Sequence, residues 1–146
     1  MKLEMENENF LKLENQLCFP LYAVSRQITQ IYQPLLNELD ITYPQYLALL
    51  TLWENGTQTV NQIGEKLLLD SGTLTPLLKR LEQKDLLNRK RSASDERVVE
   101  ISLTEKGHKL KEKALCIPLE MFTKLGISIE EAESLKRISY KILNNK

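Results

Sequence analysis

The stretch from Asp70 to Leu103 constrains the fold most, because a helical pattern there is followed directly by a basic hairpin pattern. Four leucines at i, i+3, i+4 and i+7 form one apolar stripe of a helix, namely Leu74, Leu77, Leu78 and Leu81. Asp70 precedes the stripe and is a good N-cap, since its carboxylate can accept a free backbone N–H. The opposite face is hydroxylated in its first turns and cationic further on. Such a helix is suited to contact base edges with its first turns and DNA phosphates with its later turns.

Two extended runs after this helix predict a β-hairpin. Residues 86–91 lead to a polar tip at 92–96, and residues 97–103 return with alternating apolar positions. The arms carry four basic residues, Arg89, Lys90, Arg91 and Arg97. A surface helix and hairpin with solvated charges is the simpler interpretation of any one charge run. Because this run coincides with a hydroxylated helix face, the combination favours the DNA-binding half of a winged helix.

The distribution of charge supports that interpretation, although the net charge is zero. Between Pro76 and Arg97 there are seven basic and four acidic residues, a local excess of +3, which leaves −3 for the rest of the chain. A basic patch on a neutral protein can steer it towards nucleic acid.

The remaining composition gives no support for membrane, metal or cofactor chemistry. No stretch approaches the ~20 apolar residues of a membrane helix. The acidic N-terminal residues (Glu4, Glu6 and Glu8) do not have the order of a signal peptide. Two distant cysteines and one histidine make a zinc site unsupported. We expect a cytoplasmic protein with reduced thiols and no metal or cofactor.

Long helical patterns flank the winged helix on both sides. Apolar residues step by four and three from Leu17 to Leu35, in a helix that should begin near Phe19 because Pro20 is tolerated in a first turn. Residues 60–67, a turn and residues 71–84 follow the helix-turn-helix order. After the hairpin we expect a helix that Pro118 kinks, and then a last helix capped by Ser128 with Glu131.

These patterns predict a mainly α fold with a small β-hairpin wing. Residues 1–40 would be an N-terminal segment and dimerisation helix, 41–104 a winged helix-turn-helix domain, and 105–146 C-terminal dimerisation helices. The flanking apolar stripes exceed what a domain of about 60 residues can cover, so we expect a helical dimer interface.

The sequence resembles the MarR family of regulators, and more closely its OhrR-like, organic-hydroperoxide-sensing subgroup. The likeness is carried by LENQLCFPLY (13–22), LDITYPQYLALLTLW (39–53), LDSGTLTPLLKRLE (69–82) and RKRSASDERVVEISLTEKG (89–107). It implies a homodimer that places its fourth helix in the major groove and its wing in the minor groove of a palindromic operator. By position it implies DNA-binding roles for Ser71, Thr73, Thr75, Lys79 and Arg80 on the helix, and for Arg89, Arg91, Asp95 and Arg97 in the wing. Arginine in the wing suits the narrow, negative minor groove of A·T-rich DNA, and Asp95 would orient Arg97.

Cys18 is the candidate sensor. It lies near a helix N-terminus, whose positive dipole end favours a thiolate, and Tyr22 is one turn further on the same face. Tyr32 is fourteen residues along, ~21 Å on one helix, and so can reach only the cysteine of another subunit. In OhrR-like proteins tyrosines at these two positions hydrogen-bond the reactive sulfur, so the resemblance implies the same roles here. The alternative is that Cys18 is a small core hydrophobe and the tyrosines are interface packing.

The second cysteine, Cys116, is harder to place. Some relatives pair the sensing cysteine with one from the partner's C-terminal helix, which makes Cys116 a candidate resolving thiol. Its position between Leu115 and Ile117 on an apolar stripe instead favours a buried structural residue.

The predicted function is a redox-sensing transcriptional repressor, a homodimer on palindromic operator DNA that is released when organic hydroperoxide oxidises Cys18. A low-molecular-weight thiol could then cap the oxidised sulfur. One alternative is a MarR-type regulator that binds a small phenolic ligand between the wing domain and the dimer helices, with Cys18 unused. A thiol peroxidase would need an Arg or Thr beside the sulfur; the neighbours are tyrosines and leucines, so we expect no enzyme and no catalytic residues.

Overall fold

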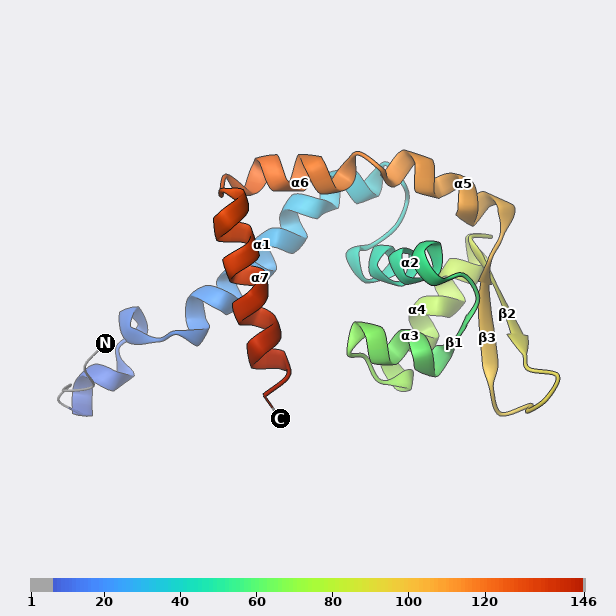
Figure 1. The fold of residues 1–146 in the computed structure, drawn as a ribbon, viewed down its shortest axis with the longest axis horizontal. Coiled ribbons are helices and arrows are strands. Elements are labelled where there is room, and N and C mark those ends of the chain that lie inside the picture. The colour runs from blue at the N-terminus through green and yellow to red at the C-terminus, as the bar shows by residue number, and fades with distance from the viewer. Residues whose placement is uncertain (1–6, 146) are drawn as a thin grey trace.

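The computed structural model describes residues 7–145, so the outermost residues of the first and last predicted segments, 1–6 and 146, lie outside it. Two short 3₁₀ helices, Asn7–Leu11 and Leu13–Asn15, lead into the body of the molecule. The helices are α1 (Cys18–Asn37), α2 (Tyr43–Asn55), α3 (Val60–Leu67), α4 (Ser71–Gln83), α5 (Glu105–Ala114), α6 (Ile117–Leu125) and α7 (Ile129–Leu143). The strands are β1 (Gln58–Thr59), β2 (Leu87–Arg91) and β3 (Val99–Leu103). The predicted class, mainly α with a small wing, is confirmed (Figure 1).

Side-chain caps fix most of the helix starts. Thr42, Thr59 and Ser128 each form a capping box with a Gln or Glu three residues on. Asp70 and Thr104 accept the backbone N–H of the third residue of α4 and α5 respectively. Each cap satisfies a donor that the first helical turn otherwise leaves free.

The hairpin prediction is also confirmed. β2 and β3 pair antiparallel, with Leu87 opposite Leu103 and Arg91 opposite Val99. The connecting loop spans residues 92–98, which is longer than the predicted tip at 92–96, and the Ser92 N–H donates to the Val98 carbonyl at 2.8 Å across its base. β1 adds a third strand beside β3, which the sequence did not indicate because two residues cannot display an alternating pattern.

The core lies where α2, α3 and α4 meet the sheet. Leu74, Leu78 and Leu81 of the predicted stripe are completely buried, and Leu77 packs partly buried against the same cluster. Ile101 of β3 closes the cluster from the sheet side. Burial of each such side chain stabilises the fold by roughly 1.5–3 kcal/mol, which holds α4 firmly on its leucine face and leaves its other face free.

The helix predicted after the hairpin is two helices rather than one kinked helix. α5 ends at Ala114 and α6 begins at Ile117, with Pro118 in its first turn. Pro118 has no N–H to donate to the Ala114 carbonyl, and its ring clashes with that carbonyl in a continuous helix, so the break falls ahead of the proline.

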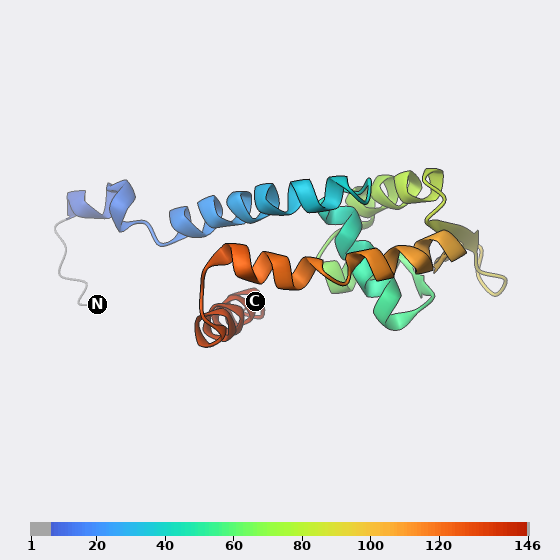
Figure 2. The same ribbon diagram turned by 90° about the horizontal axis from the view of Figure 1, so that it is seen from above.

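The flanking helices extend away from the winged helix (Figures 1 and 2). α5 and α6 run along one edge to α7, and α1 carries the N-terminal segment outwards. Large apolar side chains at the start of α1 and on α7 are exposed in the single chain, including Leu17 just ahead of α1 and Phe19, Leu21, Val24, Leu135, Ile138 and Ile142. Their exposure is what the expected dimerisation segments require, because large exposed apolar areas on a soluble protein commonly mark an interaction site.

Candidate DNA interface and sensor site

The face of α4 away from the core presents the predicted reading residues. Ser71, Thr73, Lys79 and Arg80 are exposed, and Thr75 is half-buried. The Thr73 N–H donates to the Asp70 carboxylate at 2.8 Å, and this bond holds the pKa of Asp70 below its usual value. The Thr73 hydroxyl donates to the other carboxylate oxygen at 3.1 Å, so the cap also orients one of the reading side chains.

Two exposed arginines, Arg91 and Arg97, flank the hairpin tip. Arg91 Nη1 donates to the Glu96 carbonyl at 2.6 Å. Asp95 Oδ1 accepts the Arg97 backbone N–H at 3.0 Å and lies 3.8 Å from Arg97 Nε. The Arg97 side chain is 95% exposed. Asp95 thus holds the backbone of Arg97 at the tip, and its role in orienting the Arg97 side chain stays a prediction.

Arg89 does not join the exposed arginines. It lies opposite the buried Ile101 in the sheet, its side chain is only 19% exposed, and Nη1 is 3.6 Å from Glu82 Oε2 on α4. Its Nε is buried and has no hydrogen-bond partner among the described residues. Arg89 therefore joins the wing to the reading helix, whereas a position on the DNA surface is what the sequence predicted.

Cys18 is the first residue of α1 and is exposed in the single chain. The residue before it, Leu17, offers no side-chain acceptor to the helix start. The structure therefore shows an exposed thiol at a helix start that carries no side-chain cap. Tyr22, one turn on, is exposed, and the guanidinium of Arg26 lies 4.8 Å from its ring centroid. Sequence reasoning missed Arg26, although its i+4 spacing from Tyr22 was a signal.

Tyr32 lies fourteen residues after Cys18 on the same helix and is half-buried. Its ring centroid is 4.5 Å from that of Tyr43 and 5.9 Å from that of Tyr46. Burial raises the pKa of Tyr32 to about 12 and also raises the pKa values of Tyr43 and Tyr46. All three are therefore neutral hydrogen-bond donors near neutral pH. Tyr43 was missed because it comes from another helix, and no periodicity links it to Tyr32.

Within one chain Tyr32 and Cys18 cannot meet, since fourteen residues of continuous helix separate them by ~21 Å. Of the two tyrosines, Tyr22 lies one helical turn after Cys18 on α1. A sulfur held by both tyrosines therefore requires a second copy of the chain.

Cys116 is exposed at the break between α5 and α6, so the prediction that it is buried is wrong for the single chain. The physical reason is the break itself. Ala114, Ile117 and Met121 turn inwards, whereas Leu115 and Cys116 between them face solvent.

A groove of about 530 Å³ lies between α2 and the α5–α6 segment. Its lining includes Tyr46, Trp53, Lys111 and Leu115. Within residues 7–145, no group of three or more His, Cys, Asp or Glu side chains could hold a metal ion. Over the same residues, no helix combines the length and the apolarity needed to cross a membrane.

Comparison with known proteins places the chain among transcriptional regulators. The family model "Transcriptional regulator SarA/Rot" matches residues 30–114. The chain is 62% identical, over 92% of its length and 90% of the relative's, to the organic hydroperoxide resistance transcriptional regulator of Bacillus subtilis. It is 42% identical, over 84% of its length and 83% of the relative's, to the regulator SarZ of Staphylococcus aureus.

Solved structures give the same result. The structure of reduced AbfR bound to DNA, from a protein of Staphylococcus epidermidis, superposes with a TM-score of 0.79 at 39% identity, covering 94% of this chain and 96% of the other. A DNA complex of MarR from Escherichia coli has a TM-score of 0.78 over 87% and 93% of the two chains, at 24% identity, which shows the shared fold. The chain belongs to the MarR family of transcriptional regulators, in its OhrR-like subgroup.

Proposed function

We propose that this chain is a redox-sensing transcriptional repressor that binds palindromic operator DNA as a homodimer and leaves it when organic hydroperoxide oxidises Cys18. The observation that carries the proposal is an exposed thiol at an uncapped helix start, in a chain 62% identical to a regulator named for organic hydroperoxide resistance. Because its proposed partner is operator DNA, we propose that the protein acts in the cytoplasm.

The reading surface consists of the outer face of α4 and the tip of the hairpin. Ser71, Thr73 and Thr75 would face base edges in the major groove, while Lys79 and Arg80 would contact phosphates. Arg91 and Arg97 would enter the minor groove, where a narrow A·T-rich groove attracts guanidinium groups. Arg89 would hold the wing at a fixed angle to α4 through Glu82. The structure of the relative AbfR, which is bound to DNA in its reduced form, supports DNA binding by the reduced form of this chain.

The sensor would assemble at the dimer interface. The exposed apolar faces of α1 and α7 would be covered by the second copy, which would bring the partner's α1 alongside Cys18. Tyr22 from the same helix and Tyr32 of the other copy would then donate to the sulfur. Tyr43 stacks on Tyr32 and would fix the orientation of its phenol.

The proposed chemistry is a two-electron oxidation of the thiolate. The sulfur attacks the O–O bond of the hydroperoxide, takes one oxygen as sulfenic acid, and releases an alcohol once the alkoxide gains a proton. A thiol then condenses with the sulfenic acid to a disulfide and releases water. Either product replaces the acceptor of the tyrosine hydrogen bonds. A coupling of only ~1–3 kcal/mol between this site and the reading helices would change operator affinity usefully. Since the cycle ends in an oxidised regulator, we expect no sustained turnover of peroxide.

The test is a gel shift with an A·T-rich palindrome selected from random duplexes by the reduced protein. We expect tight binding by the reduced dimer, at least a tenfold loss of affinity after stoichiometric cumene hydroperoxide, and recovery with dithiothreitol. Equal affinity before and after verified oxidation of Cys18 would contradict the redox mechanism. The absence of any selected palindrome would contradict binding to a palindromic operator.

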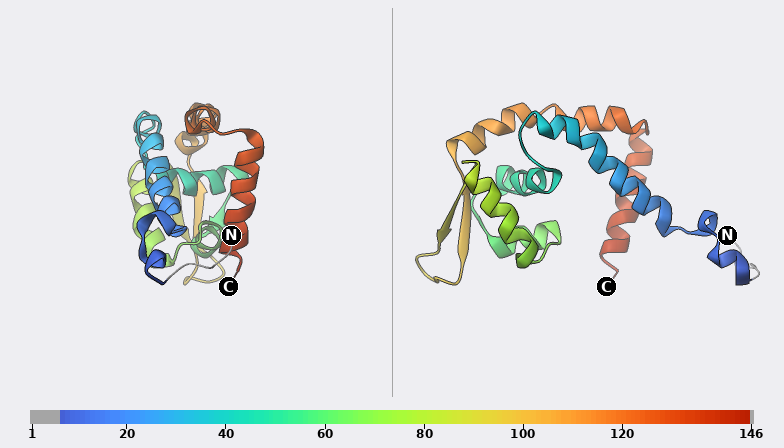
Figure 3. Two further views of the ribbon diagram at one scale, coloured as in Figure 1. Left: turned by 90° about the vertical axis from the view of Figure 1, so that its left-hand side faces the viewer. Right: turned by 180° about the vertical axis from the view of Figure 1, so that it is seen from behind.

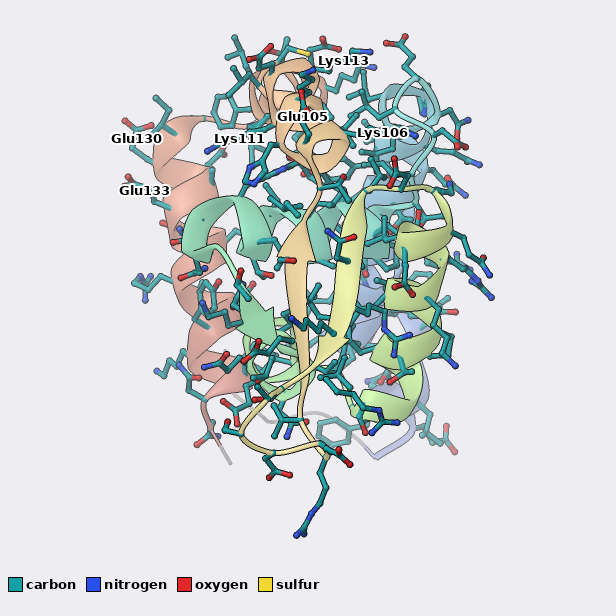
Figure 4. The ribbon with its side chains drawn as sticks, turned by 90° about the vertical axis from the view of Figure 1, so that its right-hand side faces the viewer. Glu105, Lys106, Lys111, Lys113, Glu130 and Glu133 are labelled. Carbon is teal, nitrogen blue, oxygen red and sulfur yellow. The ribbon has the colours of Figure 1, made fainter. Side chains whose placement is uncertain are left out.

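Replacing Arg97 with alanine should weaken operator binding about fivefold to tenfold and lower the slope of log affinity against log salt by about two, because one guanidinium of each subunit leaves the DNA. Fluorescence anisotropy between about 50 and 200 mM salt measures both quantities. Lys113→Ala is the matched control, since it removes an exposed cation on α5, away from the hairpin (Figure 4). Equal effects of the two substitutions would mean that the wing does not touch DNA.

The groove beside Trp53 favours a second candidate, a regulator that responds to a small phenolic ligand. Tyr46 and Trp53 offer apolar rings and Lys111 a charge for a carboxylate. A variant in which both cysteines are serine separates the two functions when titrated with salicylate. Release of DNA from this variant by salicylate would favour the ligand-binding function.

A further inference from the structure

Three chain segments meet at the C-terminal end of the reading helix. α4 ends at Gln83, α5 begins at Glu105, and the turn after α1 contains Asp40. The start of α5 lies beside the end of α4 (Figure 3, right). Under the proposed function these segments have to move together, because α1 carries the sensor, α4 reads the DNA and α5 leads to the remaining flanking helices.

Lys84, the C-cap of α4, ties the reading helix to the end of α1. Its Nζ donates to the carbonyl of Asp40 and lies 3.3 Å from Asp40 Oδ1. The Lys84 side chain is only 32% exposed, so it lies against the protein for most of its length. Lys84 thus makes two contacts to one residue across 44 positions of sequence.

The start of α5 holds the same end of α4 from another side. Lys106 Nζ donates to the Lys84 carbonyl at 2.8 Å, and the Thr104 hydroxyl donates to the Asp85 carbonyl at 2.6 Å. Figure 4 shows Lys106 on the side of α5 that faces α1 and α4, and Lys111 on the opposite side. These donors satisfy carbonyls that a helix C-terminus leaves free, where the helix dipole also favours cations.

The backbone at this junction is unusual. Asp40 and Asp85 have φ values of 54° and 59°, in the left-handed region. Aspartate tolerates this conformation better than most residues, but it still costs free energy and persists only where neighbouring groups hold it. At Asp40 the left-handed turn ends α1 and presents both a carbonyl and a carboxylate to Lys84.

We propose that Lys84 is a positioning residue that couples the end of α1 to the reading helix. The inference rests on the proposed function and concerns how the redox signal reaches DNA. A shift of α1 after oxidation displaces Asp40, and Lys84 carries that displacement to the C-terminal end of α4. Because the Asp40 side chain is 90% exposed, its ion pair with Lys84 adds little to stability, and we expect its effect on the coupling between sites and not on folding.

The test measures operator affinity of reduced and of fully oxidised protein, with Cys18 oxidation verified by mass spectrometry. We expect the ratio of oxidised to reduced Kd to fall about threefold to tenfold in Lys84→Met and about twofold in Asp40→Asn. Asparagine retains the backbone acceptor and tolerates the left-handed turn. Lys113→Met, which removes an exposed lysine of α5, should leave the ratio unchanged.

The two variants also separate coupling from simple electrostatics. Lys84→Met removes a positive charge and Asp40→Asn removes a negative one, so a direct electrostatic effect changes the DNA affinity of the two variants in opposite directions. Within each variant this effect is the same for the reduced and the oxidised protein, so it cancels in the ratio of the two Kd values. A loss of coupling lowers the ratio of oxidised to reduced Kd in both variants. The ratio in the double variant is then no lower than in Lys84→Met alone. A ratio in Lys84→Met equal to that of the wild type overturns the inference while leaving the proposed function intact. A wild type that stays on DNA after oxidation overturns both.

Discussion

Replacing Cys18 with serine abolishes the release of operator DNA by organic hydroperoxide and leaves the affinity of the untreated protein within about twofold of wild type. Serine has nearly the same shape as cysteine, so the start of α1 and the dimer contacts around it are preserved. A hydroxyl is not a nucleophile towards peroxide near neutral pH, because its pKa is far above that of a thiol. After treatment with cumene hydroperoxide, the Kd for operator DNA should rise at least tenfold in the wild type and stay unchanged in Cys18→Ser.

Cys116→Ser is the matched control, because it also removes an exposed thiol but leaves the α1 site unchanged. It should still lose DNA after oxidation. If Cys116 resolves the sulfenic acid of the partner, a covalent dimer appears on non-reducing gels of oxidised wild type and of neither single variant. The assignment of Cys18 as the sensor is wrong if the Cys18→Ser protein still leaves the operator after peroxide. If, in addition, the Cys116→Ser protein stays on the operator after peroxide, the sensing thiol is Cys116.

Features that depend on neighbours in sequence were predictable. The caps at Asp70 and Ser128, the leucine stripe of α4 and the pairing of β2 with β3 all follow from spacings of seven residues or fewer, or from a short connecting loop. Each of these signals acts between residues that are close in sequence, and the tertiary packing of the fold is consistent with the local structure that they favour.

Features set by contacts between distant elements were not predictable. Arg89 looked like the other wing arginines, but the register of β2 turns it towards Glu82 on α4. Tyr43 stacks on Tyr32, the predicted sensor tyrosine, only because α2 folds back on α1. The apolar residues around Cys116 predicted that it is buried, but the break between α5 and α6 leaves it exposed. In each case the deciding contact is absent from the residue's own helix or strand.

Replacing Gly107 with alanine should destabilise the protein by roughly 3 kcal/mol, the upper end of what overpacking costs. A Cβ at this position would lie 2.0 Å from the Leu86 carbonyl oxygen and 3.1 Å from a Leu103 methyl group. The main obstacle is backbone and cannot rotate away. The Leu86 carbonyl also accepts the Thr104 N–H at 3.2 Å, and the Gly107 carbonyl accepts the Trp53 indole N–H at 2.9 Å. Relief of the clash therefore requires α5 to leave both α2 and the turn after α4.

Thermal unfolding at fixed protein concentration measures the effect, which should be a decrease in Tm of about 6–12 °C for a chain of this size. Gly126→Ala is the control, because its Cβ would meet nothing within 4 Å and only its φ of +65° opposes alanine, at about 1 kcal/mol. A Gly107 variant that melts no lower than the Gly126 variant would show that α5 does not pack closely on Leu86. The same close contact holds Thr104 and Lys106 against the end of α4, so a Gly107→Ala protein that folds at low temperature should also bind operator DNA more weakly than the Gly126 variant.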